Sequence, residues 1–192
     1  PAAGPGRPGG FVAVNRNITE RVLAEQRSEA QLKRLRALRT IDQAIASSFD
    51  LRVTLDVLLE QVVSQLNADG AVMLLLNQPL QRLEYAASRG FHSTTFRNVQ
   101  IPLGQGFAGR AALDRRLVHV PNLFEGRGDL ARNLLLEQER FVTYFGMPLI
   151  VKGGVKGVLE VYHRRPFDPD TDWLEFLASL AGQAGIAVDN AQ

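Results

Sequence analysis

Cysteine is absent from the 192-residue chain. This absence excludes thiol nucleophiles, disulfides, zinc–thiolate sites, iron–sulfur clusters and chromophores attached through a thioether. Long apolar runs are also missing, since no stretch approaches the roughly 20 residues that a membrane-spanning helix needs. No charged segment followed by an apolar leader comes after Pro1, so we expect a cytoplasmic protein.

The chain has no strong excess of charge of either sign. Its 22 basic and 20 acidic side chains give a formal net charge of +2. A nucleic-acid-binding protein concentrates basic residues on one face, so we expect no nucleic-acid partner. The hydrophobic fraction of 45% is ordinary for a folded domain, and the length suits one domain with an appendage.

Residues that could carry catalysis show no productive spacing. The three histidines lie far apart in sequence: His92, His119 and His163. Without cysteine, they predict no metal site. No serine lies in a G-x-S-x-G turn, and nothing selects a pair among the carboxylates Glu84, Glu125 and Glu160. The adjacent Arg164 and Arg165 are expected to be solvated. We therefore expect a protein that is not an enzyme.

The N-terminal part of the chain changes character twice. Residues 1–10 are rich in glycine and proline and are expected to form a loop, and Phe11–Val14 predicts a short strand. From Ile18 to about Ser48 the composition is helical, with Asn17 as a possible cap. Apolar residues along this helix are spaced by three or four: Leu32, Leu35, Leu38, Ile41 and Ile45. Such a stripe winds around the helix. It predicts one contact with the following domain and one with a second helix in a parallel two-chain coil; the alternative is a solvent-exposed linker helix.

The rest of the chain predicts an α+β fold, with a central antiparallel sheet flanked by helices. A helix is predicted over Leu51–Leu66, ended by Asn67 to Gly70, with Gly70 as the left-handed residue. A last helix is predicted to begin at Asp168 as its cap and to continue into a domain that lies beyond this chain. The remaining elements are strands at 71–76, 83–88, 98–103, 117–120, 142–151 and 155–162, a short helix within 104–116 and another around 131–138. Lys152-Gly153-Gly154 predicts the hairpin that joins the two longest strands.

A G-x-G-x-x-G sequence at Gly104–Gly109 follows a predicted strand and opens a predicted helix. This spacing is that of a dinucleotide-binding turn, but the chain shows no βαβ alternation before it and no acidic residue at the end of the next strand. The alternative is structural, with two glycines forming a tight turn and Gly109 letting the short helix lie close to the sheet.

The order of several motifs resembles that of a GAF domain. The matching stretches are Ile101 to Ala112, Leu117 to Asn122, Tyr144 to Val151, Gly157 to Val161 and the closing helix within Phe167 to Asn190. By this resemblance, residues 35–192 form a GAF domain. Residues 11–21 resemble the end of a PAS domain, with Asn17 where that family usually has aspartate. Residues 1–17 would then be a PAS remnant and residues 18–34 a signalling helix.

The GAF resemblance implies a regulatory sensor and relay module of a bacterial-type signalling protein, such as a two-component system. Such domains hold a small ligand between the sheet and the segment that corresponds to about 121–143. The pocket residues implied here are Met73, Phe107, Arg110, Asn122, Phe124, Phe141 and Tyr144. The resemblance also implies a homodimer through the helix that carries Leu32, Leu35, Leu38, Ile41 and Ile45, and an output domain in the same longer chain.

The ligand and any cofactor are unknown from the sequence. The bilin chromophores and the free methionine sulfoxide reductase activity of some GAF proteins require cysteine, so neither is expected. Asn122-Leu123-Phe124-Glu125 matches the cyclic-nucleotide motif of other members only weakly. The alternative function is a GAF domain without a ligand that acts as a dimerisation spacer, with large aromatic side chains filling its own pocket.

Overall fold

The computed structural model describes residues 10–47, 50–93, 95–125 and 138–191. The chain divides into two compact units, Pro1–Arg36 and Ala37–Gln192. The first unit contains the N-terminal part of helix α1 (Gly10–Ser47), and the second contains the last turns of α1 and all other elements.

Helix α1 begins earlier than the sequence predicts. Phe11–Val14 is helical, so the predicted strand is wrong, and Gly10, the last residue of the predicted loop, is helical too. Residues 1–9 lie outside the described part. A lone four-residue strand has no partner to pair with, whereas extending an existing helix adds one hydrogen bond for each residue. The solvent-exposed surface of α1 carries an i,i+4 ion pair, with Arg21 Nε 3.2 Å from Glu25 Oε1.

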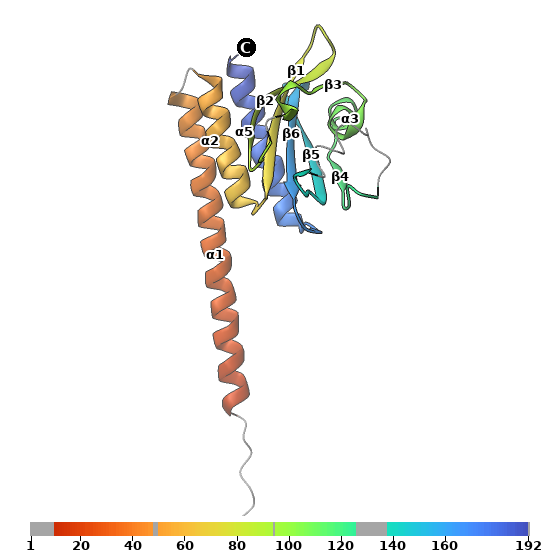
Figure 1. Cartoon of the computed structure of the whole chain (residues 1–192). Helices are drawn as coiled ribbons and strands as arrows, with labels where there is room; N and C mark the ends of the chain where they lie inside the picture. The colour runs from red at the N-terminus through yellow and green to blue at the C-terminus, as the bar shows by residue number, and fades with distance from the viewer. Residues whose placement is uncertain (1–9, 48–49, 94, 126–137, 192) are drawn as a thin grey trace, which may run out of the picture. The chain divides into compact units, whose positions relative to one another are not determined.

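The second unit is an α+β domain with a six-stranded antiparallel sheet in the order β3-β2-β1-β6-β5-β4 (Figure 1). The strands are β1 (Gly70–Asn77), β2 (Arg82–Arg89), β3 (Gln100–Pro102), β4 (Val118–Val120), β5 (Thr143–Val151) and β6 (Gly154–His163). The helices are α2 (Leu51–Gln65), the 3-10 helix η1 (Thr95–Asn98), α3 (Gly106–Asp114) and α5 (Thr171–Ala191). The predicted fold class is confirmed. The helix predicted around 131–138 lies outside the described residues except for Gln138.

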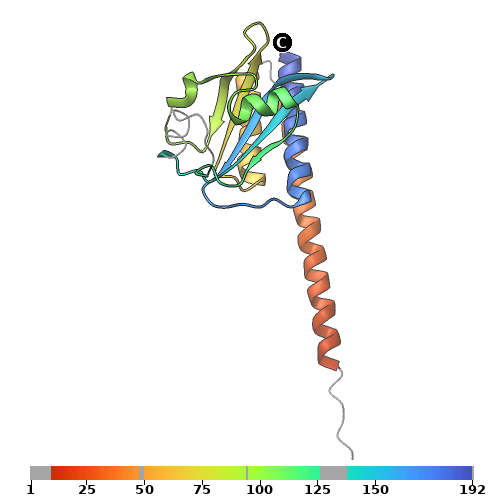
Figure 2. The same ribbon diagram turned by 90° about the vertical axis from the view of Figure 1, so that its right-hand side faces the viewer.

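Each face of the sheet has its own apolar core. Figures 1 and 2 show α2 and α5 on one face, which we call the helix-pair face, and α3 on the other, which we call the α3 face. The helix-pair face includes Leu159 and Val161 of β6 together with Trp173 and Leu180 of α5. The α3 face includes Val158 and Tyr162 of the same strand. The central strands are therefore covered on both sides, and successive side chains enter different cores.

The ends of two helices differ from the predicted ones. After α2, the left-handed residue is Asn67 (φ 50°), so the prediction for Gly70 is wrong. Gly70 instead starts β1, where a Cβ would lie 2.8 Å from Cζ of Phe141. At α5 the carboxylate of Asp170 accepts a hydrogen bond from the backbone N–H of Trp173 at 2.7 Å, so Asp170 takes the capping role predicted for Asp168.

The glycine-rich turn before α3 has a packing role. Gly104 and Gly106 both have positive φ, and the N–H of Gly104 donates to the carbonyl of Gly109 at 2.9 Å. A Cβ at Gly109 would overlap the carbonyl oxygen of Pro102 in β3. The absence of a side chain therefore allows α3 to lie directly against the edge of the sheet, as the structural alternative predicts.

Replacing Gly109 by alanine should lower the free energy of unfolding by about 2 kcal/mol, because the added methyl group overlaps backbone that has little freedom to move. Gly182 in α5 is a matched control, since a Cβ there meets nothing within 4 Å. Gly182→Ala should raise stability by about 0.5–1 kcal/mol through helix propensity. Urea unfolding of both variants measures the difference, and equal effects would contradict this packing of α3.

Candidate ligand-binding site

A layer of aromatic rings covers the middle of the α3 face. Ring centroids are 5.3 Å apart for Phe107 and Tyr144, 5.3 Å for Tyr144 and Tyr162, and 4.9 Å for Tyr162 and Phe141. Phe91 continues the layer, with its centroid 4.9 Å from that of Phe141. The rings come from α3, from β5 and β6, and from the segments beside them. They are brought together by the pairing of the strands, in which Tyr144 lies directly opposite Tyr162.

A buried carboxyl group lies within this aromatic layer. Glu160 of β6 is 1% exposed, and the side chains on either side of it, Leu159 and Val161, belong to the opposite face. The hydroxyl of Tyr144 donates a hydrogen bond of 3.0 Å to Oε1 of Glu160. Gly146 is the partner of Glu160 across β5 and β6, and a Cβ there would overlap this same hydroxyl. The glycine thus leaves the space that lets the phenol reach the carboxyl group.

Burial of a glutamate in an apolar layer is uncommon, because a carboxyl group loses its hydration there and needs hydrogen bonds in return. Among the described residues the buried polar or charged side chains are Thr54, Glu139, Thr143, Glu160 and His163, and Glu160 is the one that accepts a hydrogen bond from a ring of this layer. Glu160 is therefore the side chain by which the α3 face differs most from an ordinary apolar core. We take Glu160 as the centre of the candidate site.

Three predicted pocket residues, Phe107, Phe141 and Tyr144, lie in the aromatic layer. Met73 does not join them. It is fully buried on the helix-pair face, so its place in the predicted pocket is wrong. The reason is the two-residue period of β1, in which Val72 and Leu74 point to the α3 face and Met73 between them points away.

The remaining predicted pocket residues lie at the rim. Arg110 is exposed, and its guanidinium lies over the ring of Phe107 at 5.4 Å from the centroid. Asn122 accepts a hydrogen bond from the N–H of Phe124 at 3.0 Å and donates one of 2.8 Å to Glu125, which forms a local turn. Phe124 is 55% exposed. The contacts described for these three side chains are therefore with Phe107 and within the loop after β4.

The residues predicted for the dimer helix are divided between two environments. Ile41 is fully buried in the helix-pair core of its own chain and so presents no free surface to a second chain, whereas Leu38 and Ile45 are partly buried against that core. Leu32 and Leu35 are 49% and 63% exposed. The contact of the winding stripe with the following domain is thus present, and the contact with a second helix stays a prediction.

Arg164 is the centre of a second polar cluster, which the sequence analysis missed. Its side chain donates to the carbonyls of Glu139 at 2.9 Å and Gly90 at 2.9 Å, and its backbone N–H donates to the carboxylate of Asp69 at 2.7 Å. Its guanidinium also lies 3.2 Å from Oε2 of Glu139 and 4.6 Å from the ring centroid of Phe141. The expectation that Arg164 is solvated is therefore wrong, because it joins four separate segments of the chain.

Glu139 is buried at this cluster. Burial raises its pKa, but hydrogen bonds from the backbone N–H of Ser93 and from the ring and backbone of His92 outweigh that effect, so the pKa lies below its usual value. The three distances are 2.7 Å for Ser93 N, 2.8 Å for His92 Nδ1 and 2.8 Å for His92 N. The carboxylate is therefore held in its charged form as the partner of Arg164.

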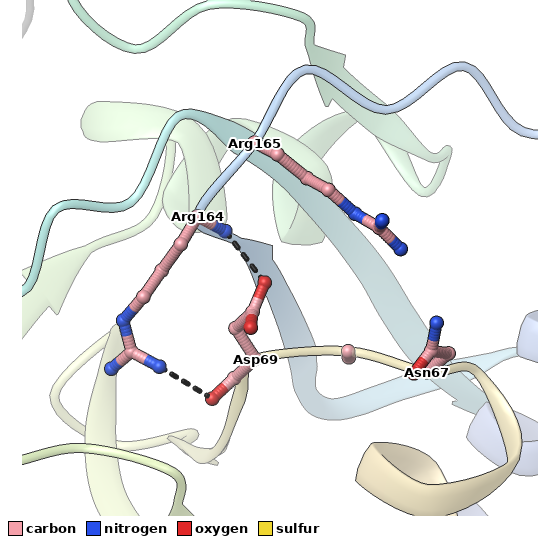
Figure 3. A pocket seen from close by; sticks show the side chains of 5 residues that line it. Asn67, Asp69, Arg164 and Arg165 are labelled. Carbon is pink, nitrogen blue, oxygen red and sulfur yellow. Dashed lines mark hydrogen bonds between the residues drawn. The ribbon is translucent and has the colours of Figure 1, made fainter.

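Arg165 differs from its neighbour. Figure 3 shows Arg164 turned toward Asp69, whereas Arg165 points the other way, toward Asn67, across a surface hollow of about 410 Å³. Arg165 is exposed, and the described residues provide it with no ion pair. The two adjacent arginines thus have the same charge and very different surroundings.

Replacing Arg164 by alanine should lower the free energy of unfolding by about 3 kcal/mol, since it leaves the buried carboxylate of Glu139 without its cation. Arg165→Ala removes the same side chain from the next position and should change stability by less than about 0.5 kcal/mol. Urea unfolding at pH 7.5 separates the two. Similar losses for both variants would show that Arg164 does not have the role described.

His163 is fully buried at the end of β6 on the helix-pair face. Its ring stacks on Phe167 with centroids 4.2 Å apart, and neither ring nitrogen has a hydrogen-bond partner among the described residues. Burial lowers the pKa of His163; the charge of Asp69 acts in the opposite direction, and that of Arg165 adds to the lowering. The imidazole is therefore neutral at pH 7.

Stability should fall as the pH drops below about 6.5, because the unfolded chain then takes up a proton that buried His163 does not. This contribution is fully present above pH 6.5. His163→Phe should reduce the loss of stability between pH 7.5 and pH 5.5. At pH 7.5 it should change the free energy of unfolding by less than about 1.5 kcal/mol.

The control for this titration is His119→Phe. His119 stacks on Phe145 with centroids 4.4 Å apart and is exposed on edge strand β4. Partial burial lowers the pKa of His119 as well, and the charge of Asp168 acts in the opposite direction. Because its ring is more exposed than that of His163, this variant should keep more of the pH dependence than His163→Phe does, as measured by urea midpoints at the two pH values. Glu139, whose pKa is also lowered, contributes only at more acidic pH. If His163→Phe lost as much stability between the two pH values as the parent protein, His163 would not be the source of this pH dependence.

The described residues contain no helix suited to cross a membrane and no cluster of histidine and carboxylate side chains that could hold a metal ion. A comparison with curated protein sequences gives no match.

Several solved structures share this fold. The GAF domain of a phosphoenolpyruvate-protein phosphotransferase from Acinetobacter is 26% identical, with 82% of this chain and 94% of that chain covered and a TM-score of 0.69. A free methionine-R-sulfoxide reductase from Neisseria meningitidis, solved with its substrate, is 19% identical over 85% of this chain and 92% of its own, with a TM-score of 0.69. A domain of a methyl-accepting chemotaxis protein is 20% identical over 79% and 96%, with a TM-score of 0.67.

The sequence profile of the GAF domain matches residues 50–188, which include α2, the whole sheet and most of α5. The match covers more than half of the chain and agrees with the sheet order and with the two-sided core. The chain therefore belongs to the GAF domain family.

Proposed function

We propose that this GAF domain is a regulatory sensor and relay module of a multidomain signalling protein, and that it binds a small ligand on the α3 face of its sheet. The observation that carries the proposal is the buried carboxyl group of Glu160, hydrogen-bonded to Tyr144 within an aromatic layer. The similarity of the fold to a domain of a methyl-accepting chemotaxis protein supports a role in signalling. The proposal assigns no catalytic step to this chain.

The strands that form the site also contact the C-terminal helix. Tyr144 faces the candidate site, and the next residue, Phe145, faces the other way, with its ring 4.7 Å from that of Trp173 in α5. A shift of β5 that follows ligand binding would therefore reach α5 through one residue. A ligand can drive such a shift only if it binds the two arrangements of the domain with different affinities.

The hairpin between β5 and β6 provides a second connection to α5. Asp189 in the last turns of the helix lies 2.9 Å from Nζ of Lys152 and 2.7 Å from Nζ of Lys156. Hydrogen bonds from Lys156 and then Lys152 lower the pKa of Asp189, so its carboxylate stays charged. Ion pairs thus hold the C-terminal end of α5 against the hairpin of the same two strands. We propose that this end of α5 leads to an output domain in a longer chain.

Helix α1 is the proposed dimer contact, through the exposed part of its apolar stripe at Leu32 and Leu35. In this arrangement α1 brings a signal in and α5 carries it out. The interpretation of residues 1–17 as a PAS remnant, followed by a signalling helix, belongs to the same proposal and rests on the sequence resemblance alone.

A second candidate function is favoured by the contacts between the rings themselves. Phe107, Tyr144, Tyr162 and Phe141 pack in a continuous series, so these side chains fill part of the space that a ligand would use. A domain whose rings fill the site completely would serve as a dimerisation spacer that binds nothing.

Thermal denaturation in the presence of a panel of nucleotides and metabolites distinguishes the two functions. A sensor should show a saturable rise in Tm with at least one compound, because a ligand that binds only the folded state stabilises it by mass action. A spacer should respond to none, and that result would overturn the ligand-binding part of the proposal.

The dimer contact is tested by the double variant Leu32→Glu, Leu35→Glu, which places charge on the exposed stripe. The dissociation constant of the dimer should rise at least about tenfold, which corresponds to about 1.4 kcal/mol. The control is Gln26→Glu, Gln31→Glu, which adds the same charge to exposed polar positions of the same helix. Sedimentation equilibrium measures both, and a dimer equally stable in the two variants, or a monomeric parent protein, would contradict the proposed contact.

A further inference from the structure

We propose that a surface hollow at one end of the sheet binds a small zwitterion of the α-amino acid class, with the carboxylate of the ligand on Arg165 and its ammonium group on Asp69. The hollow has a volume of about 410 Å³ and lies between the α2–β1 and β6–α5 connections. We call it the Arg165 hollow, and it is lined by Asn67, Ala68, Asp69, Arg164 and Arg165. It shares no residue with the candidate site around Glu160, so the inference does not depend on the proposed function.

Two side chains of opposite charge line the Arg165 hollow, and they do not pair with each other. Among the described residues, neither Arg165 nor Asp69 takes part in an ion pair. Burial is the main cause that lowers the pKa of nearby His163; the charge of Asp69 raises this pKa and that of Arg165 lowers it, so both charges lie close to one ring. A ligand with a single charge is attracted by one of the two side chains and repelled by the other. A zwitterion is attracted by both.

The second arginine of the hollow is already occupied. The guanidinium of Arg164 lies 3.2 Å from Oε2 of Glu139 and donates to the carbonyls of Glu139 and Gly90, each at 2.9 Å. The buried carboxylate of Glu139 thus balances the positive charge of Arg164. Arg165 is therefore the lining cation that stays available to a ligand.

Arg165 and Asn67 fit the carboxylate of the ligand. Figure 3 shows the guanidinium of Arg165 extending toward the side-chain amide of Asn67. Both residues are exposed, and neither side chain has a hydrogen-bond partner within the described part of the chain. A guanidinium presents two parallel N–H donors that match the two oxygens of a carboxylate, and an amide adds a further donor. The two side chains together can therefore hold one carboxylate group.

Asp69 fits the ammonium group. Its Oδ2 accepts a hydrogen bond of 2.7 Å from the backbone N–H of Arg164, which fixes the position of the side chain. Its Oδ1 accepts no hydrogen bond from the described residues and is not one of their buried atoms without a partner, so it is accessible to a ligand. An ammonium group has three N–H donors, and a hydrogen bond from one of them to a carboxylate is strengthened by the opposite charges.

The backbone around the hollow is held in place without a ligand. Asn67 takes the left-handed conformation (φ 50°) that ends α2. The N–H of Asp69 donates to the carbonyl of Tyr162 in β6 at 2.9 Å, and the carbonyl of Arg165 accepts from Oγ1 of Thr143 in β5 at 3.1 Å. Binding therefore needs to order only the ends of the Arg165 and Asn67 side chains, which keeps its entropic cost small.

The Arg165 hollow lies beside a contact between α2 and α5. The carbonyl of Leu66, the residue before Asn67, accepts a hydrogen bond of 3.1 Å from Nε1 of Trp173 in α5. The ring of Trp173 also lies 4.7 Å from that of Phe145 in β5. A ligand on Asn67 thus acts one residue away from the tryptophan that connects the sheet to the C-terminal helix.

Three probes of similar shape and different charge test the proposal: L-alanine, L-lactate and L-alaninamide. Lactate lacks the ammonium group and alaninamide lacks the carboxylate. Alanine is sufficient as the zwitterion, because the charged head group makes the contacts. The titration is followed by ¹H–¹⁵N NMR of the purified chain at about pH 6.5, where an α-amino group is protonated. L-Alanine should shift the backbone amides of Ala68 and Asp69 in a saturable way and should bind at least about fivefold more tightly than either other probe.

Arg165→Ala removes the proposed carboxylate contact and should weaken L-alanine at least about tenfold. Because Arg165 is exposed, this variant is expected to fold. Arg52→Ala is the matched control, since it removes the same charge from an exposed position at the other end of α2 and should leave binding unchanged. Asp69→Asn keeps an acceptor oxygen for the N–H of Arg164 and removes the negative charge, so the preference for L-alanine over L-lactate should disappear.

Three results would overturn the proposal: no saturable shift with L-alanine, tighter binding of L-lactate than of L-alanine, or equal binding of L-alanine to Arg165→Ala and Arg52→Ala. The same variants separate this inference from the proposed function. A compound that still raises the Tm of Arg165→Ala binds elsewhere, so the sensor function can stand when the Arg165 hollow binds nothing. Conversely, L-alanine binding that Arg165→Ala abolishes supports the hollow whether or not the α3 face takes a ligand.

Discussion

The fold depends on one constraint: the central strands are covered on both faces, so consecutive side chains belong to different cores. This alternation places Leu159 and Val161 against the helices α2 and α5 and Glu160 among the aromatic rings on the α3 face. It also places Phe145 against Trp173 while Tyr144 reaches Glu160. A structural change on one face can thus reach the other face through a single residue of the strand. The proposed relay uses this property of the sheet and requires no other mobile element.

The polar groups around the sheet divide into those that hold the fold and those that fit a ligand. Arg164 and Glu139 form a buried ion pair with several further hydrogen bonds, and they join the ends of β1, β2 and β6 to the start of β5. Their contacts explain them fully as structural groups. Glu160 differs, because it lies inside β6 and is buried within the aromatic layer. The position of Glu160 gives it little part in joining the strands and suits a role in binding a ligand.

Much of the fold could be predicted from periodicity and turn chemistry, because these depend on neighbouring residues. The helix at Leu51–Gln65 and the hairpin at Lys152–Gly153 are examples. The site could not be predicted in the same way. Tyr144 and Glu160 are sixteen residues apart, and their contact depends on the register of β5 against β6. Only the lone acid in the apolar run of β6 could have indicated it. The prediction that Met73 lines the pocket is wrong for a related reason. A difference of one residue in register moves a side chain to the opposite face of the sheet.

The central claim is that a ligand acts on the α3 face and reaches α5 through β5. The most direct measurement is a methyl NMR spectrum of the chain, labelled at leucine and valine, during titration with a compound that raises the Tm of the domain in a saturable way. The account predicts that the first shifts arise at Val72, Leu74 and Val158, which line the α3 face, followed by smaller shifts at Leu180 of α5. Shifts that begin on the helix-pair face at Leu159 and Val161, or a spectrum that does not change, would contradict it.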